Sequence, residues 1–296
     1  MAYDLQASTA GLKKEVVDAM VKQVAAPSYR FKQALAIETT NAWDNTFYRE
    51  DPATSSGPTG NLFEGVPWGA EFPQRTVDFS RHTVNIIKFA AEENIPIENQ
   101  WMNAINVLTR TVIRRTQDVV KAVDDYIWGE LTQDFETGQA LSEIQSYAIS
   151  TIRAWNQTSS AILDDMLGAS RLIANKNYDV SNLIMFISPR DKQSIMNWIA
   201  ERGAQWPSLA TGVVSNGNIG QIGGIKLVEA ASVTASYALM VKPQTCATWK
   251  AALPLTSDTV TDPLKSIRFR CAEEGALLRT DPLAIVLIKG TQDANA

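Results

Sequence analysis

Few residues in this chain have the types and spacing that catalysis requires. His82 is the single histidine, and Cys246 and Cys271 are the only cysteines, so a Ser/His/Asp or Cys/His site would have to use His82. His82 follows Arg81 in a segment that predicts a strand, and no G-x-S-x-G motif occurs, which favours a strand histidine without a catalytic role. No Cys/His cluster has zinc-ligand spacing. We therefore expect no catalytic residue, no metal site and no cofactor.

Two further patterns could carry chemistry, and both have simpler explanations. Adjacent residues on a helix point about 100° apart, so an acidic doublet is a poor general acid–base pair. Exposed faces or salt bridges between subunits explain the four doublets better: Glu92-Glu93, Asp124-Asp125, Asp164-Asp165 and Glu273-Glu274. The glycine-rich stretch 217–224 has the spacing GxxGxxG, lacks a Walker lysine and precedes a strand-like segment, so it predicts a turn rather than a phosphate-binding loop.

The composition indicates a folded protein. Its 296 residues are 45% hydrophobic and 20% charged, and the net charge of −5 disfavours wholesale coating of nucleic acid. Two cysteines without a CxxC pair indicate a reducing compartment. The start of the chain lacks a signal-peptide pattern, and the longest apolar runs are too short to span a bilayer, so we expect cytoplasmic synthesis and no membrane.

One long amphipathic helix dominates the first half of the expected elements. Apolar residues recur at helical spacing from Glu98 to Gln133, with Arg114–Asp118 and Lys121–Asp125 as expected ion pairs. Before it, a shorter helix is expected over 9–24 in a segment that resembles an arm rather than core. Turn-forming residues fill 51–75, and a strand is expected over 76–92.

The second half mixes helices and strands. A helix is expected over 159–175 and a buried strand over 182–187; Ser188 and Pro189 then have the types preferred at the N-cap and first position of another helix. Short strands are expected over 224–229, 237–242, 247–250, 266–270 and 283–289, with a turn around 273–275. The class is α+β with non-local pairing.

The candidate binding residues are tryptophans in irregular segments and lysines near the N-terminus. Trp101, Trp128, Trp198 and Trp249 lie in periodic segments and are expected in the core. Irregular segments instead hold Trp43, Trp68 and Trp206, which are candidate anchors between subunits, as tryptophan is enriched at binding hot spots. Lys13, Lys14 and Lys22 give the N-terminus a positive bias, consistent with a solvated helix face or with contact to DNA or an acidic neighbour.

The order of these parts resembles the HK97-like major capsid proteins of tailed double-stranded DNA viruses. The resemblance rests on 68–71 with 83–97, which is similar to the limb of an E-loop entering a spine helix, on the strand-to-helix passage 181–191, on the I-G-x-I-x-G pattern within 219–229, and on 267–270 and 283–286 as closing strands. It covers roughly residues 30–290.

The resemblance implies both an architecture and a function. It implies an N-arm (1–38), an E-loop with flanking strands (39–97), a P-domain spine helix (98–140), an A-domain (141–262) and closing P-domain strands with a tail (263–296). It further implies a virion structural protein, assembled in the host cytoplasm, whose pentamers and hexamers form an icosahedral shell around the genome. Implied partners are further copies of the chain, portal, scaffolding and decoration proteins, and weakly held DNA. Trp68 and Glu71 would lie on the E-loop.

One departure from the family and several alternatives remain. Some members cross-link an E-loop lysine to a neighbour, but no lysine occurs between Lys32 and Lys88, so we expect a non-covalent shell. An encapsulin-type cellular compartment would share the fold. Another virion structural protein is an alternative if the match to the A-domain is accidental. An oligomeric enzyme is the alternative of a different class, and it would need a polar cluster that one histidine and unpaired acidic residues do not supply.

Overall fold

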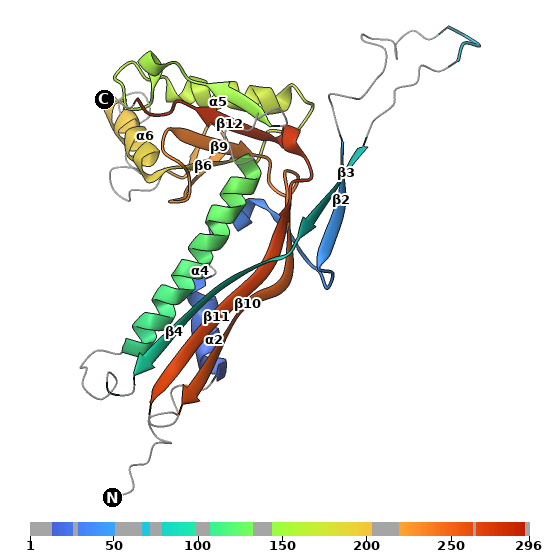
Figure 1. Cartoon of the computed structure of the whole chain (residues 1–296). Coiled ribbons are helices and arrows are strands. Elements are labelled where there is room, and N and C mark those ends of the chain that lie inside the picture. The colour runs from blue at the N-terminus through green and yellow to red at the C-terminus, as the bar shows by residue number, and fades with distance from the viewer. Residues whose placement is uncertain are drawn as a thin grey trace, which may run out of the picture.

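The computed structural model describes residues 14–25, 29–50, 67–71, 79–96, 98, 107–132, 144–202, 219–262 and 265–293. Within these ranges the chain forms a mixed α+β structure with one elongated part and one rounded part (Figure 1). The elongated part holds a four-stranded sheet, here called the long sheet, and the rounded part holds a six-stranded sheet. A two-stranded hairpin projects to one side (Figure 1).

The long sheet has the strand order β1-β10-β11-β4. Its bounds are β1 (Ala36–Thr39), β4 (Ile87–Pro96), β10 (Thr248–Asp262) and β11 (Ser266–Leu278). Strands β10 and β11 are antiparallel and carry 15 and 13 residues, far beyond the usual five or six. The expected turn at 273–275 is wrong, because β11 runs through it. The expected short strand at 247–250 is only the beginning of β10.

Two helices cover one face of the long sheet. Helix α2 (Lys14–Ala25) and helix α4 (Val107–Thr132) bury a shared apolar cluster against it, made of Val17, Val21, Ala25, Val112, Val119, Val120, Leu255, Phe269 and Cys271. Residues at i, i+4 and i+8 of α2 form its buried stripe. The expectation that the N-terminal segment stays outside the core is therefore wrong for its described residues. Phe31, in the short helix η2 (Phe31–Ala34), is also fully buried.

Helix α4 links the two sheets. Its 26 residues correspond to about 40 Å at 1.5 Å per residue. The first half packs on the long sheet, and Val123, Ile127 and Leu131 in the second half join the core of the rounded part. The expected long helix is confirmed over 107–132. Residues 99–106 lie outside the described ranges.

The six-stranded sheet has the order β5-β12-β9-β6-β8-β7. Its strands are β5 (Gln145–Ala148), β6 (Ile184–Ile187), β7 (Gln221–Ile222), β8 (Ile225–Glu229), β9 (Tyr237–Val241) and β12 (Ile285–Lys289). All four residues of β6 are buried, since Ile184 and Phe186 face the α4 side and Met185 and Ile187 face the other. The buried strand expected at 182–187 is confirmed.

Helices α5 (Ile162–Ala174) and α6 (Pro189–Glu201) cover the second face of this sheet, and short turns η4 (Thr151–Arg153) and η5 (Pro282–Ala284) flank it. Ser188 caps α6 as expected: its Oγ accepts from the Asp191 N–H at 3.1 Å, and Pro189 takes the first position. The glycine-rich stretch forms a turn, with Gly220, Gly223 and Gly224 at positive φ, before β8.

The pairing of two strands crosses the segment boundaries that the sequence suggested. Strand β10, grouped by sequence with residues 141–262, pairs with β11 and β1 in the long sheet. Strand β12, grouped with the closing strands 263–296, lies between β5 and β9 in the six-stranded sheet. The pairings of β1 with β10 and of β5 with β12 join residues more than 100 positions apart, which local sequence patterns do not encode.

Candidate assembly surface

The projecting hairpin is a two-stranded ribbon with unlike faces. Strand β2 (Asp44–Glu50) pairs with β3 (Phe79–Asn85), so that Tyr48 lies opposite Arg81 and Phe47 opposite His82. One face, which holds Thr46, Tyr48, Arg81 and Thr83, is exposed throughout. An isolated two-stranded hairpin is marginal in water. Burial of the exposed face against a partner would therefore stabilise this ribbon.

The second face of the ribbon is partly covered and contains the single histidine. Asn45 and Arg49 are buried, and the rings of Phe47 and His82 stack with centroids 5.5 Å apart. Ser80 Oγ lies 2.9 Å from His82 Nε2. His82 thus lies in a strand, as expected, and its ring packs against an aromatic neighbour.

Large apolar side chains are exposed on and around the ribbon. Trp68 is fully exposed in the segment 67–71, and Trp43, Tyr48, Phe79 and Ile37 are each more than 60% exposed. Exposed apolar surface costs about 25 cal/mol per Å² relative to burial, so these side chains are candidates for burial against a partner. Trp43 and Trp68, both expected as anchors, are therefore accessible. The exposure of Tyr48, Phe79 and Ile37 was not expected from the sequence.

The remaining candidate residues have different positions. Glu71 is exposed beside Trp68, whereas Trp206 and Lys13 lie outside the described residues. Lys22 is exposed on α2, and Lys14 begins that helix. Trp43 directly precedes β2, while Trp68 lies in the segment beyond the other end of the hairpin (Figure 1). The anchors thus occupy opposite ends of the projection rather than one patch.

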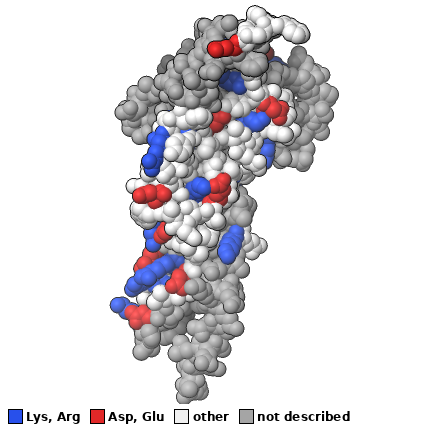
Figure 2. All heavy atoms as spheres, turned by 90° about the vertical axis from the view of Figure 1, so that its right-hand side faces the viewer, with Lys and Arg blue, Asp and Glu red and all other residues white. Residues whose placement is uncertain are grey.

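The face of the long sheet opposite the helices carries ion pairs between neighbouring strands. Glu92 on β4 lies 2.6 Å from Arg270 Nε and 3.3 Å from Arg268 Nε on β11. Lys88 pairs with Glu274 at 3.3 Å, and Lys250 pairs with Glu38. Acidic and basic side chains are interspersed along the side of the molecule drawn in Figure 2, without a continuous patch of one sign. Such exposed pairs contribute little stability each.

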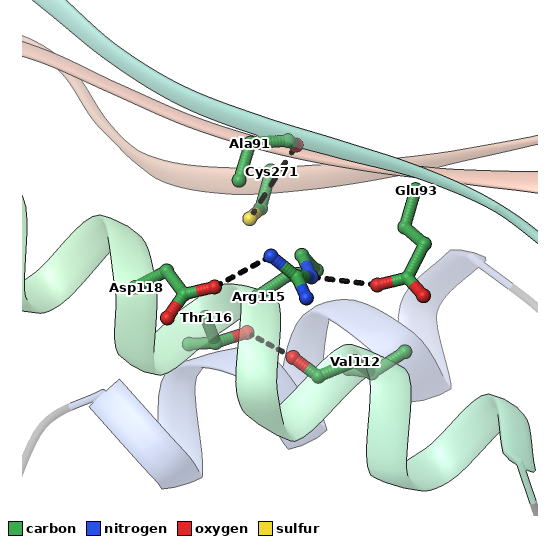
Figure 3. Close-up of polar contacts among 7 residues, drawn as sticks. All are labelled: Ala91, Glu93, Val112, Arg115, Thr116, Asp118 and Cys271. Carbon is green, nitrogen blue, oxygen red and sulfur yellow. Dashed lines mark hydrogen bonds and ion pairs between the residues drawn. The ribbon is translucent and has the colours of Figure 1, made fainter.

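Arg115 bridges α4 and β4 at the seam between helix and sheet. Its guanidinium donates to Glu93 at 2.6 Å and to Asp118 at 2.7 Å (Figure 3). The expected i,i+4 pair between Arg114 and Asp118 is therefore wrong. Asp118 instead pairs with Arg115, three residues before it, and Arg115 also pairs with Glu93 on β4.

Three of the four acidic doublets turn one carboxylate inward, contrary to the expectation of exposed faces, whereas both side chains of Glu92-Glu93 are partly exposed. Asp124, Asp165 and Glu273 are at most 5% exposed. Asp124 accepts the Arg30 N–H at 3.0 Å, and Asp165 accepts the Trp155 indole N–H at 3.2 Å. Neighbouring residues point about 100° apart on helices α4 and α5 and to opposite faces of strand β11, so one member of each of these three doublets faces inward.

Glu273 forms the base of a buried polar cluster. It accepts hydrogen bonds from the Tyr29 hydroxyl and the Lys32 ammonium. Lys32 Nζ also lies 3.7 Å from the centre of the Tyr29 ring and 4.8 Å from that of Trp249. Burial lowers the pKa of Lys32 against the opposing effect of Glu273, and burial followed by Glu273 raises the pKa of Tyr29. Burial also raises the pKa of Asp124 to about 6.

Two surface pockets are defined by described residues. The first, about 370 Å³, lies over the buried cluster and is lined by Tyr29, Lys32, Gln33, Ile37, Trp249, Ala251, Pro254, Leu255 and Glu273. The second, about 330 Å³, lies between α6 and the segment 155–160 and has a largely polar lining. In the described parts of the chain, no group of three or more His, Cys, Asp or Glu is placed to hold a metal ion. No helix there is both long and apolar enough to cross a membrane.

Comparisons with known proteins identify the fold. No protein-family model and no curated protein matches the sequence. A virus-like particle from Pyrococcus furiosus aligns with 93% of this chain and 98% of its own at 10% identity and a TM-score of 0.64. The capsid of cyanophage P-SCSP1u aligns with 89% and 88% at 10% identity and a TM-score of 0.65. The capsid of a native GTA particle aligns with 88% and 90% at 12% identity and a TM-score of 0.59.

These neighbours are structural shell proteins, and the likeness extends along almost the whole chain. It includes both sheets and the helix that links them, and it gives no direct support for catalysis. The chain has the mixed α+β fold of HK97-like phage capsid structures.

Proposed function

We propose that this chain is a major capsid protein, whose copies assemble into pentamers and hexamers and close into an icosahedral shell around viral DNA. The observation that carries the proposal is the full-length likeness to shell-forming proteins, with 93% and 98% of the two chains aligned in one case. The ribbon supports it independently, because its open face and exposed aromatic side chains need a partner.

The parts of the chain then have distinct tasks. The hairpin and the residues it joins, within 39–97, act as the E-loop; α4 is the spine helix of a P-domain built on the long sheet; and the six-stranded sheet with α5 and α6 is the A-domain. In this assignment β10 belongs to the P-domain and β12 to the A-domain, as their pairing requires. Residues 1–38 supply an N-arm whose second half is anchored by Val21 and Phe31.

Assembly proceeds through unlike surfaces. Contacts between two different patches close into rings when the rotation allows, and those rings are the pentamers and hexamers. Specific interfaces bury about 1,200 to 2,000 Å² in total, and each contact added to a closing shell benefits from high effective concentration. Since no lysine occurs between Lys32 and Lys88, the shell is held without E-loop lysine cross-links. Subunit ladders that survive boiling in detergent would contradict this.

Electron microscopy of the purified protein, with light scattering for mass, tests the proposal. Closed shells or rings of five and six are expected. Deleting residues 55–70 should leave the circular dichroism spectrum and thermal transition of the subunit nearly unchanged while abolishing shells. A uniform small oligomer from the intact chain, even with other virion proteins present, would overturn the capsid proposal. Normal shells from the deletion variant would overturn the E-loop assignment.

An encapsulin-type cellular compartment is the second candidate, favoured by the likeness to the particle from Pyrococcus furiosus. Both candidates form closed shells, so assembly alone does not separate them. Nuclease-protected DNA inside particles from the native source identifies a virus shell and weak DNA contact. A protein cargo without nucleic acid identifies a compartment.

A further inference from the structure

The pocket over the buried cluster has apolar walls and an electrically balanced base. Trp249, Leu255 and Ala251 form walls from β10, and Ile37, 61% exposed on edge strand β1, stands at its rim. At the base the Lys32 ammonium is paired with Glu273. A neutral apolar group is therefore better suited to this pocket than an anion, which would have to compete with Glu273 for Lys32.

Trp68 has the complementary properties. It is fully exposed, in a turn closed by a 3.1 Å hydrogen bond from the Ala70 N–H to the Pro67 carbonyl. Gly69 follows it with φ +80°, a conformation that glycine adopts without strain. The turn thus presents a large aromatic side chain to solvent.

The turn and the pocket of one chain do not face each other. The segment 67–71 lies beyond the far end of the hairpin (Figure 1), whereas the pocket is lined by residues of η2, β1, β10 and β11. An indole that buries 150–250 Å² typically dominates the interface in which it lies. Within the described parts of the chain no surface covers Trp68, so a neighbouring copy is a source of one.

We propose that Trp68 of one subunit binds in the pocket formed by Tyr29, Ile37, Trp249 and Leu255 of a neighbouring copy. The inference rests on the proposed shell function and names the contact that the E-loop makes. The pocket's volume of about 370 Å³ exceeds that of an indole side chain. Lys32, already close to the rings of Tyr29 and Trp249, receives a third aromatic neighbour. The turn and the pocket are different surfaces of the subunit, so the contact is heterologous, the type of contact that can close rings.

Cysteine cross-linking in assembled shells tests this contact. Cys246 and Cys271 are both buried, so the native background is low. Ala70→Cys, which keeps Trp68, is combined with Ile37→Cys at the pocket rim and treated with a short bismaleimide. The matched control combines Ala70→Cys with Ile152→Cys, since Ile152 is 75% exposed beside the six-stranded sheet. Electron microscopy verifies shells for both variants.

Ladders of linked subunits are expected for the Ile37 pair and not for the Ile152 pair. Shells without ladders, or equal ladders in both, overturn the contact and leave the capsid proposal standing. If the unmodified protein forms no shells, the proposed function itself fails.

Substitution provides a second measurement that does not depend on engineered cysteines. Trp68→Ala should reduce shell yield at a fixed subunit concentration about tenfold or more, and Ile152→Ala should leave it unchanged. Trp68→Ala shells that form with the yield of the unmodified protein overturn the inference.

Discussion

The Trp249 indole lies directly against the backbone of Gly275 on the neighbouring strand, so closely that a Cβ on Gly275 would lie 2.4 Å from Trp249 Cζ2 and 2.9 Å from the Lys250 carbonyl. The glycine sits inside β11 because the largest side chain of β10 needs that space. Trp249 is also a wall of the pocket assigned to Trp68.

Replacing Gly275 with alanine should destabilise the subunit by about 1–3 kcal/mol, the usual cost of overpacking a core, because neither the indole nor the Lys250 backbone can move freely. Urea unfolding of the unassembled subunit measures this. Gly129→Ala is the control: a Cβ there meets nothing within 4 Å, and alanine favours the helix. Equal stability of the two variants would contradict the packing described.

Removing the charge of Glu273 should cost about 3 kcal/mol or more, because Glu273→Gln leaves the Lys32 ammonium buried without its counter-charge. The neighbouring residue provides a matched control. Glu274→Gln removes a carboxylate from the same strand whose partner Lys88 is 62% exposed, and little change is expected. Denaturant unfolding of both variants at neutral pH gives the two free energies of unfolding. Equal values would contradict a stabilising role of the Lys32–Glu273 ion pair.

Asp124 should make folding dependent on pH. Its pKa is about 6 in the folded subunit and about 3.9 in an unfolded chain, so the folded state binds the proton more tightly. Its stabilising contribution is present below about pH 4 and is lost as the pH rises through 6. Relative to Asp124→Asn, the unmodified protein should therefore lose about 2 kcal/mol between pH 4.5 and 7.5.

Urea unfolding at both pH values measures the difference. Asp125→Asn, on the exposed side of the same doublet, is the control and should show no such trend. A difference in unfolding free energy between the unmodified protein and Asp124→Asn that stays constant between the two pH values would show that the pKa of the Asp124 carboxyl is not raised.

The two thiols should be unreactive in the folded subunit. Burial raises the pKa of Cys246 to about 12 and that of Cys271 to about 11, so almost no thiolate exists at pH 8. A chromogenic disulfide reagent should detect no thiol before unfolding and two afterwards. Ile37→Cys, at the pocket rim, should react at once in the unassembled subunit.

Local signals predicted local structure well. Ser188 and Pro189 identify the start of α6 because capping depends on residues within one turn, and the spacing of Val112, Val119 and Val123 identifies α4 in the same way. Gly275 led to the wrong prediction of a turn, because the sequence does not distinguish a glycine that makes room for Trp249 from a glycine in a turn. The inward carboxylates of Asp124 and Glu273 were missed because their partners, Arg30 and Lys32, are distant in sequence.

The candidate surface was predictable only in part. Trp43 and Trp68 stand out as aromatic residues among turn formers, and both are exposed. The pocket is different, because it combines Ile37 with residues of β10 and β11 that are more than 200 positions away. No local pattern identifies such a site, and only the pairing of β1 with β10 creates it.

Strands β3 and β4 are one extended run of chain with a single interruption at Ile86, whose N–H bonds to the Trp43 carbonyl at 3.2 Å. A pull on the hairpin is therefore delivered along the axis of β4, perpendicular to the hydrogen bonds of the ten residue pairs that join it to β11. Loaded in this direction, the hydrogen bonds of a ladder resist together rather than opening one after another. In the proposed shell, tension along the hairpin would therefore be carried by the whole β4–β11 ladder at once.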